Sequence, residues 1–420
     1  MKILIRSARI IDPSSPFHHK SKDILIENGL ISKIADKIRG GSGIKLIEGS
    51  NIHLSNGWVD LRANFCEPGH EYKEDIQSGL KAAAFGGYSG VVLSSGTHPP
   101  IDNRASVEFL LSRRKNQAVD IYPLGTVSEK MEGKELSEMY DMQSGGAIGF
   151  SDNKQTIGSN KLLFKALSYS HAFNGLIMDF PMDYDWIDEG QVHEGIVSTE
   201  MGVKGIPEEA EAMMVQRDLS MLKYAGGRLH LGPLSSTLSL KLIKKAKSEG
   251  LSITAEVSHH SLFLEDDSTS EFDSNFKLMP PLRDAKNRKT LLNALKDGTI
   301  DAISSDHQPE DDDEKKIEFL RSAYGAIGLE STFAISLKAV GDLDLVIEKL
   351  TTGPRSVLGL ENPSIDVGSK ANLTVFDPKA KWLFSKDTVH SKSFNSPYLG
   401  RELIGRSLAV INGKRHFISD

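Results

Sequence analysis

The chain has 420 residues, which suits one large domain with an appendage. With 39% hydrophobic and 25% charged residues it can bury a sizeable core, which excludes a disordered or fibrous protein. Fifty Lys and Arg against fifty-seven Asp and Glu give a net charge of −7. Without a basic excess to neutralise phosphates or anionic lipid, we predict that the protein binds neither nucleic acid nor membranes.

The first residues and the cysteine content indicate in which cellular compartment the protein is found. The apolar run at residues 1–11 is interrupted by Arg6 and Arg9, so it resembles neither a signal peptide nor a membrane span. Cys66 is the only cysteine and has no intramolecular disulfide partner, which favours a reducing environment. We therefore predict a cytoplasmic protein.

Both ends of the chain are rich in short β-type runs. Residues 3–5, 23–26 and 30–34 form such runs, and Asn28-Gly29 between the last two is a strong hairpin signal. Residues 372–378 and 407–414 repeat the pattern at the other end. We predict a small β-sandwich domain made of residues 1–55 and 361–420.

The middle, residues 56–360, alternates buried-strand runs with amphipathic stretches such as 75–84, 207–225 and 238–249. Eight strand candidates are present, at residues 58–61, 90–93, 121–124, 147–150, 176–178, 228–231, 253–257 and 301–304. This pattern predicts an α/β fold, a (β/α)8 TIM-type barrel, whose active site is built at the carboxyl ends of the strands.

Motifs along this middle region resemble one family. Residues 57–69 (GWVDLRANFCEPG), followed by Tyr72-Lys73-Glu74-Asp75, resemble the first barrel strand and loop of dihydroorotases. Further motifs stand in the family's order, at residues 146–152, 193–195, 205–207, 254–257, 280–283, 297–301 and 304–309. The resemblance spans essentially the whole chain. It implies a type I dihydroorotase of the amidohydrolase superfamily, in which a zinc-bound hydroxide attacks a ring amide.

The sequence departs from that family at the metal ligands. Where the family's first strand ends in His-x-His, this chain has Arg62 and Asn64, and an arginine cannot ligate zinc. The histidines of strands five and six align with Phe180 and Pro233. By the resemblance, only two metal-binding positions keep a residue that could bind a metal. They are Asp152, at the bridging-carboxylate position, and the family's catalytic aspartate. Two carboxylates alone are not a zinc site, so we expect no zinc cofactor.

The positions that hold the substrate in the family also differ. The resemblance aligns the family's arginine, two asparagines and a histidine with Cys66, Gly96, Met279 and Glu310. None of these reproduces the bidentate grip of an arginine on a carboxylate, and an ionised Glu310 would repel an anionic substrate. We therefore predict no substrate-binding residues of the family type.

Asp306, at the family's catalytic position, is the one candidate catalytic residue, should the chain be active. A buried carboxylate needs a partner, and we predict an ion pair between Asp306 and Arg62. We predict that the acidic run 310–314 is a solvated loop rather than a metal site. We also predict that Cys66 is an inert thiol.

Other histidines and aspartates near the strand ends could form a relocated active site, but a structural role is the favoured interpretation for them. Single strand-borne histidines are usually core residues, adjacent histidines on an extended segment face opposite ways, and isolated aspartates often cap loops. The residues concerned are His98, Asp179, Asp183, His230, His259, His260 and His307.

These observations predict a dihydroorotase-like protein of pyrimidine biosynthesis that has lost metal binding and activity. By the resemblance, it would act as a structural or regulatory partner of aspartate carbamoyltransferase or of an active dihydroorotase, and we expect a homo-oligomer. The alternative is an active hydrolase of cyclic amides with a relocated site. An intact dihydroorotase is the third reading.

Overall fold

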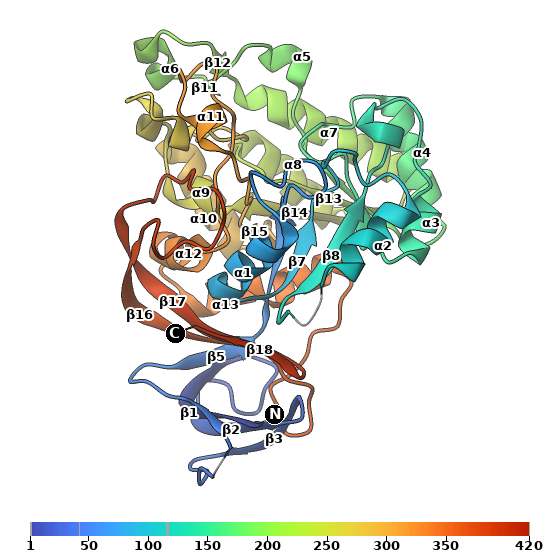
Figure 1. Ribbon diagram of the computed structural model, residues 1–420. Helices are drawn as coiled ribbons and strands as arrows, with labels where there is room; N and C mark the ends of the chain where they lie inside the picture. The colour runs from blue at the N-terminus through green and yellow to red at the C-terminus, as the bar shows by residue number, and fades with distance from the viewer. Residues whose placement is uncertain (1, 42, 115–116, 420) are drawn as a thin grey trace.

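The computed structural model describes residues 2–41, 43–114 and 117–419. Figure 1 shows two parts: a barrel surrounded by helices, and below it a curled sheet to which both ends of the chain contribute. The predicted fold class, a TIM-type barrel with a β-unit formed by both termini, is confirmed.

Within the described residues, the barrel consists of eight parallel strands, one at each predicted position. In the sheet they follow the order of the chain, so each strand neighbours the next one along the sequence. They are β6 (Trp58–Ala63), β7 (Tyr88–Leu93), β8 (Asp120–Gly125), β9 (Gly149–Phe150), β10 (Leu176–Asp179), β13 (Arg228–Leu231), β14 (Ile253–Ser258) and β15 (Ala302–Ser304).

The first and last strands close the barrel by a few hydrogen bonds near their carboxyl ends. The His307 amide donates to the Arg62 carbonyl at 3.2 Å, and the Asn64 amide donates to the His307 carbonyl at 2.9 Å. The Asp60 carboxylate accepts from the Ser305 amide at 2.6 Å. These contacts fix the segment after β6 beside the segment after β15, which brings Arg62 and Asp306 to the same end of the barrel.

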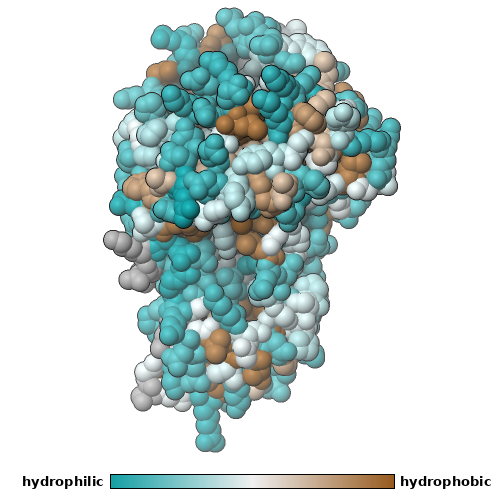
Figure 2. Space-filling model, turned by 90° about the vertical axis from the view of Figure 1, so that its right-hand side faces the viewer, coloured by the Kyte–Doolittle hydropathy of each residue, from teal (hydrophilic) through white to brown (hydrophobic). Residues whose placement is uncertain are grey.

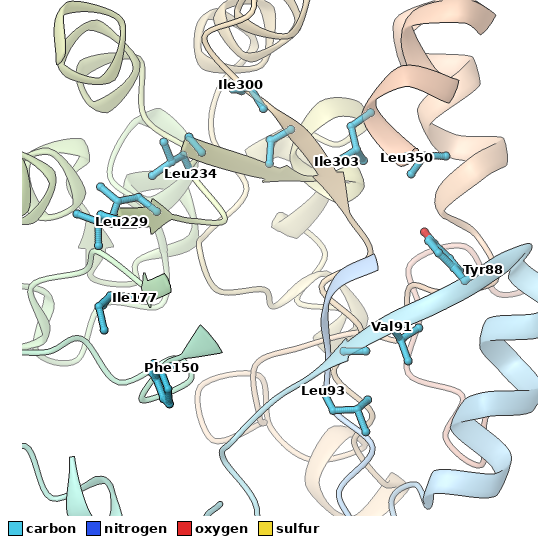
Figure 3. Close-up of a cluster of buried hydrophobic side chains, with 14 of the residues drawn as sticks. Tyr88, Val91, Leu93, Phe150, Ile177, Leu229, Leu234, Ile300, Ile303 and Leu350 are labelled. Atoms are coloured by element: carbon cyan, nitrogen blue, oxygen red, sulfur yellow. The ribbon is translucent and has the colours of Figure 1, made fainter. Parts of the chain in front are cut away.

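Two layers of apolar side chains hold the barrel together. The larger layer lies between strands and helices and includes Val91, Ile177 and Leu229 (Figure 3). A smaller cluster includes the strand residues Val92 and Met178, which directly follow Val91 and Ile177 of the larger layer in the sequence. Because neighbouring residues of a strand point to opposite faces, this smaller cluster fills the barrel interior.

Three of the helices around the barrel, α1, α7 and α8, lie at the three stretches predicted from the sequence, with ends that differ by at most two residues. Asp75 caps α1 in a reciprocal pair with Ser78, and Gly87 ends it at a φ of 98°. The main helices are α1 (Ile76–Gly86), α2 (Arg104–Ser112), α3 (Met139–Ser144), α4 (Asn160–His171), α7 (Glu208–Ala225), α8 (Thr237–Ser248), α10 (Ala285–Lys296), α12 (Thr332–Val340), α13 (Leu343–Leu350) and α14 (Thr352–Leu358).

Shorter elements lie in the loops at the carboxyl ends of the strands. The small parallel pair β11 (Val192–His193) and β12 (Gly205–Ile206) follows β10. The short helices are α5 (Tyr184–Ile187), α6 (Ile196–Met201), α9 (His259–Phe263) and α11 (Asp312–Lys315). Together with β11 and β12, α5 and α6 form the top of the molecule in Figure 1.

The terminal unit is a mixed sheet in the order β18-β17-β16-β5-β1-β2-β3, with β4 beside β1. Asn28 and Gly29, both at positive φ, join β2 and β3, which confirms the predicted hairpin. The domain boundaries at residues 55 and 360 stay a prediction. The strands are β1 (Lys2–Ile11), β2 (Ser21–Glu27), β3 (Leu30–Ala35), β4 (Lys45–Ile47), β5 (His53–Asn56), β16 (Asn372–Phe384), β17 (Arg401–Asn412) and β18 (Arg415–Ile418).

The surface is mainly polar on the side where α3 and α4 lie. Figure 2 shows this side, with hydrophobic residues in small separate patches among hydrophilic ones. Within the described ranges, no helix is long and apolar enough to span a bilayer.

Candidate functional site: the mouth of the barrel

The residues at the carboxyl ends of the strands are almost entirely buried. Arg62 and Asp306 each expose 7% of their surface, Asn64 exposes 8%, and Phe180 exposes 1%. Pro233 is buried as well. Neighbouring side chains therefore cover the positions that the resemblance aligns with the family's metal ligands.

Arg62 forms an ion pair with Glu256 on β14. Its Nε donates to Glu256 Oε1 at 2.7 Å, and the side chains expose 8% and none of their surface. The neighbours of Glu256, Ala255 and Val257, belong to the outer apolar layer, so Glu256 points into the barrel. The expected pair between Arg62 and Asp306 is wrong, because β14 supplies a carboxylate directly in reach of Arg62.

The electrostatics of Glu256 follow from that pair. Burial alone would raise its pKa, but the Arg62 guanidinium and the ring of His230 outweigh burial and lower the pKa to about 2. The His230 ring also bonds the Thr254 hydroxyl through Nδ1 at 2.8 Å. His230 is therefore a hydrogen-bonded core residue, as the sequence predicts.

Asp306 pairs instead with Lys154, which follows β9. Lys154 Nζ lies 2.8 Å from Asp306 Oδ2, donates to the Met279 carbonyl at 2.6 Å, and lies over the Phe180 ring at 5.9 Å from its centroid. Burial raises the pKa of Asp306, and the Lys154 ammonium acts against that shift. Among the described residues, Glu256 and Asp306 are thus both buried carboxylates with a cationic side chain as partner.

An apolar cluster packs around Phe180 at this end of the barrel. Phe180 and Met279, at two of the family's functional positions, belong to it and are nearly fully buried. Tyr324 packs against the cluster and donates its hydroxyl to the Gly190 carbonyl at 2.8 Å. The remaining members are Met182, Ile187, Ile206 and Ala210.

Asp152, at the bridging-carboxylate position, is engaged with its own neighbourhood. Its Oδ1 accepts from the amides of Val127 and Ser128 at 2.8 and 3.0 Å, and its Oδ2 accepts from the Ser128 hydroxyl at 2.6 Å. Burial raises its pKa. These bonds hold the loop after β8 and occupy both carboxylate oxygens.

The donor set at the mouth does not fit the zinc that the resemblance implies. Zinc sites need several neutral imidazoles or thiolates that converge with a carboxylate. Here the aligned positions hold a guanidinium, an amide, a phenyl ring and a proline. The carboxylates of Glu256 and Asp306 are paired with Arg62 and Lys154, and both oxygens of Asp152 accept hydrogen bonds from Val127 and Ser128. The one group of three or more potential metal-ligating side chains found among the described residues lies elsewhere, at His18, His19 and Asp344.

The aligned substrate-binding positions are also filled by other contacts. A side chain at Gly96 would place its Cβ 2.4 Å from Asn153 Nδ2. Glu310 is buried and pairs with Lys73 Nζ at 2.6 Å, so this end of the acidic run is not the solvated loop we expected. Cys66 exposes 3% of its surface, and burial raises the pKa of its thiol to about 12, which fits an inert thiol.

The other histidine candidates do not converge on the mouth. His259 and His260 lie at the start of helix α9 with ring centroids 3.9 Å apart, so the expectation of opposite-facing rings on an extended segment is wrong. Both are buried and bond to Ser331 and Tyr398. His307 Nδ1 accepts from the Gly328 amide at 3.1 Å.

Of the remaining candidates, two aspartates are structural and one histidine is exposed. Asp179 accepts from the Ile157 amide at 3.1 Å and pairs with Arg217. Asp183 caps α5, and His98 is exposed in the loop after β7.

Sequence reasoning missed Lys154 and the role of Glu256. Glu256 carried a usable signal, because an acidic residue inside a buried strand requires a cationic partner. Lys154 carried none, since its position two residues after Asp152 does not indicate which way its side chain points.

Comparisons with known proteins bear on the family and on the fold. Residues 53–239 match the family described as Dihydro-orotase-like. The dihydroorotase of Geobacter metallireducens is 36% identical to this chain, over 99% of this chain and 99% of that relative. The dihydroorotase of Ruminiclostridium cellulolyticum is 35% identical, over 98% of this chain and 97% of that relative. Among solved structures, an L-hydantoinase (dihydropyrimidinase) from Arthrobacter aurescens superposes with a TM-score of 0.85 at 21% identity, covering 99% of this chain and 96% of that one. A dihydropyrimidinase from Brevibacillus agri gives 0.82 at 20% identity over 100% and 95%.

Proposed function

The chain belongs to the dihydroorotase family, and from that premise we propose that it is a noncatalytic dihydroorotase-like protein of pyrimidine biosynthesis. In this role it serves as a structural or regulatory partner of another enzyme of the pathway. Aspartate carbamoyltransferase and an active dihydroorotase are the candidate partners.

The observation that carries the proposal is how the mouth is filled. Two cationic side chains, Arg62 and Lys154, pair with the buried carboxylates of Glu256 and Asp306, and the apolar cluster around Phe180 packs beside them. A metal ion placed there would have to displace Arg62 or Lys154 from its carboxylate, and a polar substrate would have to displace buried apolar side chains.

A role in association is supported by exposed apolar side chains on the helices. Tyr224 on α7 exposes 81% of its surface, and its ring lies 5.7 Å from that of Phe164 on α4, which is also exposed. Ile196 on α6 exposes 78%. Aromatic residues are enriched at protein–protein interfaces relative to the rest of the surface, which favours this pair of rings as part of a contact surface.

Turnover of dihydroorotate and metal content test the loss of chemistry. We expect no hydrolysis above background by protein purified without chelator, and no zinc at the mouth. Zinc content should be measured in the natural chain and in Asp306→Asn. Zinc that is tightly bound to the natural chain and absent from that variant, together with turnover, would contradict the proposal.

Co-purification from native extract tests the role as a partner. We expect one of the two pathway enzymes to be recovered with the untagged chain, and Asp306→Asn to preserve both recovery and growth without added pyrimidine. Tyr224→Asp should reduce recovery, whereas Tyr72→Asp, at another exposed tyrosine, should not. A requirement for Asp306 in a stably folded protein with no partner recovered would contradict the proposal.

One observation favours the second candidate, an active hydrolase of cyclic amides with a relocated site. A depression of about 350 Å³ lies beside the mouth and is lined by His98, Lys130, Asn153 and Lys154, among others. Asp306, through its pair with Lys154, adjoins it. Hydrolysis of a panel of cyclic amides that is lost in both His98→Ala and Asp306→Asn would support this reading.

A further inference from the structure

A second place in the molecule gathers side chains that bind metals, at the amino-terminal unit. We propose that His18, His19 and Asp344 bind one divalent transition-metal ion, such as Zn²⁺, Ni²⁺ or Cu²⁺, which ties the turn after β1 to helix α13. The inference is independent of the proposed function, because none of these residues lies at the barrel mouth.

The turn places two adjacent imidazoles on the same side. Neighbouring residues of an extended chain point in opposite directions, but His19 has a φ of 61°, in the left-handed region. The ring centroids of His18 and His19 are consequently only 3.7 Å apart. A non-glycine residue in this conformation is strained, so the surrounding turn must hold it there.

The third ligand comes from a distant part of the chain. Asp344 lies in the first turn of α13, and its Oδ2 is 3.2 Å from His19 Nε2. One ligand atom from each of the three residues lies within 4.8 Å of the other two. Ligands about 2.0–2.2 Å from a tetrahedral zinc ion are about 3.3–3.6 Å apart, so modest side-chain rotations would complete three positions.

The ligand types select the kind of ion. Two imidazoles and one carboxylate suit zinc, nickel and copper, whereas magnesium and calcium prefer oxygen ligands only. The side chains of His19 and Asp344 are 40% and 49% exposed, which leaves the fourth position open to water or to a ligand from solution.

The surroundings are acidic on the side of Asp344. A cleft of about 890 Å³ between the terminal sheet and helices α13 and α14 is lined by Asp12, Asp342, Asp344 and Glu348 against one lysine, Lys296. Such a negative cleft raises the local concentration of cations.

On the other side, two weak contacts oppose binding. The Asp12 amide donates to His18 Nδ1 at 3.2 Å, and Arg9 Nη2 lies 3.5 Å from His19 Nδ1. Both contacts are long, and a metal ion that binds the rings at Nε2 must weaken them. Arg9 is exposed, so its side chain can move away.

Calorimetric titration of the full, untagged, chelator-treated chain with Ni²⁺ and with Zn²⁺ tests the site. We expect one ion per chain with a dissociation constant of about 10 μM or lower. His19→Ala should weaken binding about 100-fold and Asp344→Asn about 10-fold. Arg9→Gln should tighten it, because a cation is removed beside His19. His171→Ala, at another exposed histidine, should leave binding unchanged.

Copper bound to the chain gives an independent readout, because electron paramagnetic resonance reports nitrogen ligands directly. We expect two-nitrogen coupling in the natural chain and its loss in His19→Ala. Binding weaker than about 1 mM, an adventitious ion only, or unchanged binding in a His19→Ala/Asp344→Asn double variant would overturn the proposal. An ion that is lost in Asp306→Asn and kept in His19→Ala would place the metal at the mouth, which overturns this site and the proposed loss of metal chemistry together.

Discussion

Arg62 Nε and Glu256 Oε1 lie 2.7 Å apart inside the barrel, joined across β15, the strand between β6 and β14. A charge buried in this way is costly when its partner is removed, whereas removal of both charges together is often neutral. The pair therefore gives a sharp test of how the mouth is stabilised.

Arg62→Met should destabilise the protein by about 3–5 kcal/mol at neutral pH, because Glu256 remains buried without its cation. Arg62→Met/Glu256→Gln should recover most of that loss. Arg62 Nη2 and Glu256 Oε2 have no hydrogen-bond partner among the described residues, so the double variant gives up few satisfied bonds. Urea unfolding of the three proteins measures this, and a double variant as unstable as the single one would contradict it.

Restoring histidines at the first strand should not restore activity. Arg62→His/Asn64→His still lacks the imidazoles of strands five and six, where Phe180 and Pro233 remain. Groups that act as a unit do not contribute additively, so we expect turnover of dihydroorotate at background with and without added zinc. Zinc-dependent turnover in this variant would show that other residues complete the site. Circular dichroism should confirm that the variant is folded.

The pH dependence of stability should report Asp60. Burial raises its pKa to about 7, against hydrogen bonds from Ser305, whereas the unfolded chain has the ordinary value near 3.8. Between about pH 4 and 7 the folded state binds the extra proton, so its contribution to stability falls as the pH rises, by at most about 1.4 kcal/mol per unit. The free energy of unfolding of the natural chain, measured relative to Asp60→Asn, should decline over this window. A flat difference would contradict the assignment.

Cys66 should react with thiol reagents only after unfolding. It is buried, and its raised pKa leaves almost no thiolate at neutral pH. Because it is the only cysteine, labelling by an aromatic disulfide measures the opening of this region without interference. We expect labelling in the native state to be slower by several orders of magnitude than in denaturant, with Cys66→Ser as the blank. Rapid native labelling would mean that the mouth opens readily.

The fold was predictable because periodic patterns depend on local chemistry. The eight strands and the three helices read from the sequence occur in the structure, since apolar runs, caps and glycines act within a few residues. The exact ends were less predictable: β16 continues to Phe384, beyond the expected end at residue 378, with irregular register between Asp377 and Lys381.

The pairing of charges at the mouth was not predictable in the same way. Which carboxylate Arg62 meets depends on strand tilt and on one side-chain direction, because Glu256 inside β14 and Asp306 just after β15 belong to neighbouring parts of the same barrel. Similarly, the carboxylate of Asp152 turns toward the amides of Val127 and Ser128, a choice that depends on the loop after β8. The sequence shows which residue types stand at the aligned ligand positions. It does not show which side chains those residues contact in place of a metal ion.

The position of β5 in the terminal sheet has a consequence for synthesis of the chain. β5, at residues 53–56, pairs on one side with β1 and on the other with β16, which the ribosome makes more than three hundred residues later. Until then, the nascent protein carries an uncovered strand edge, the kind of surface that promotes misassembly. A message truncated just before codon 372 would yield a product with that edge permanently open, and cells should degrade or aggregate it even though every barrel strand is present.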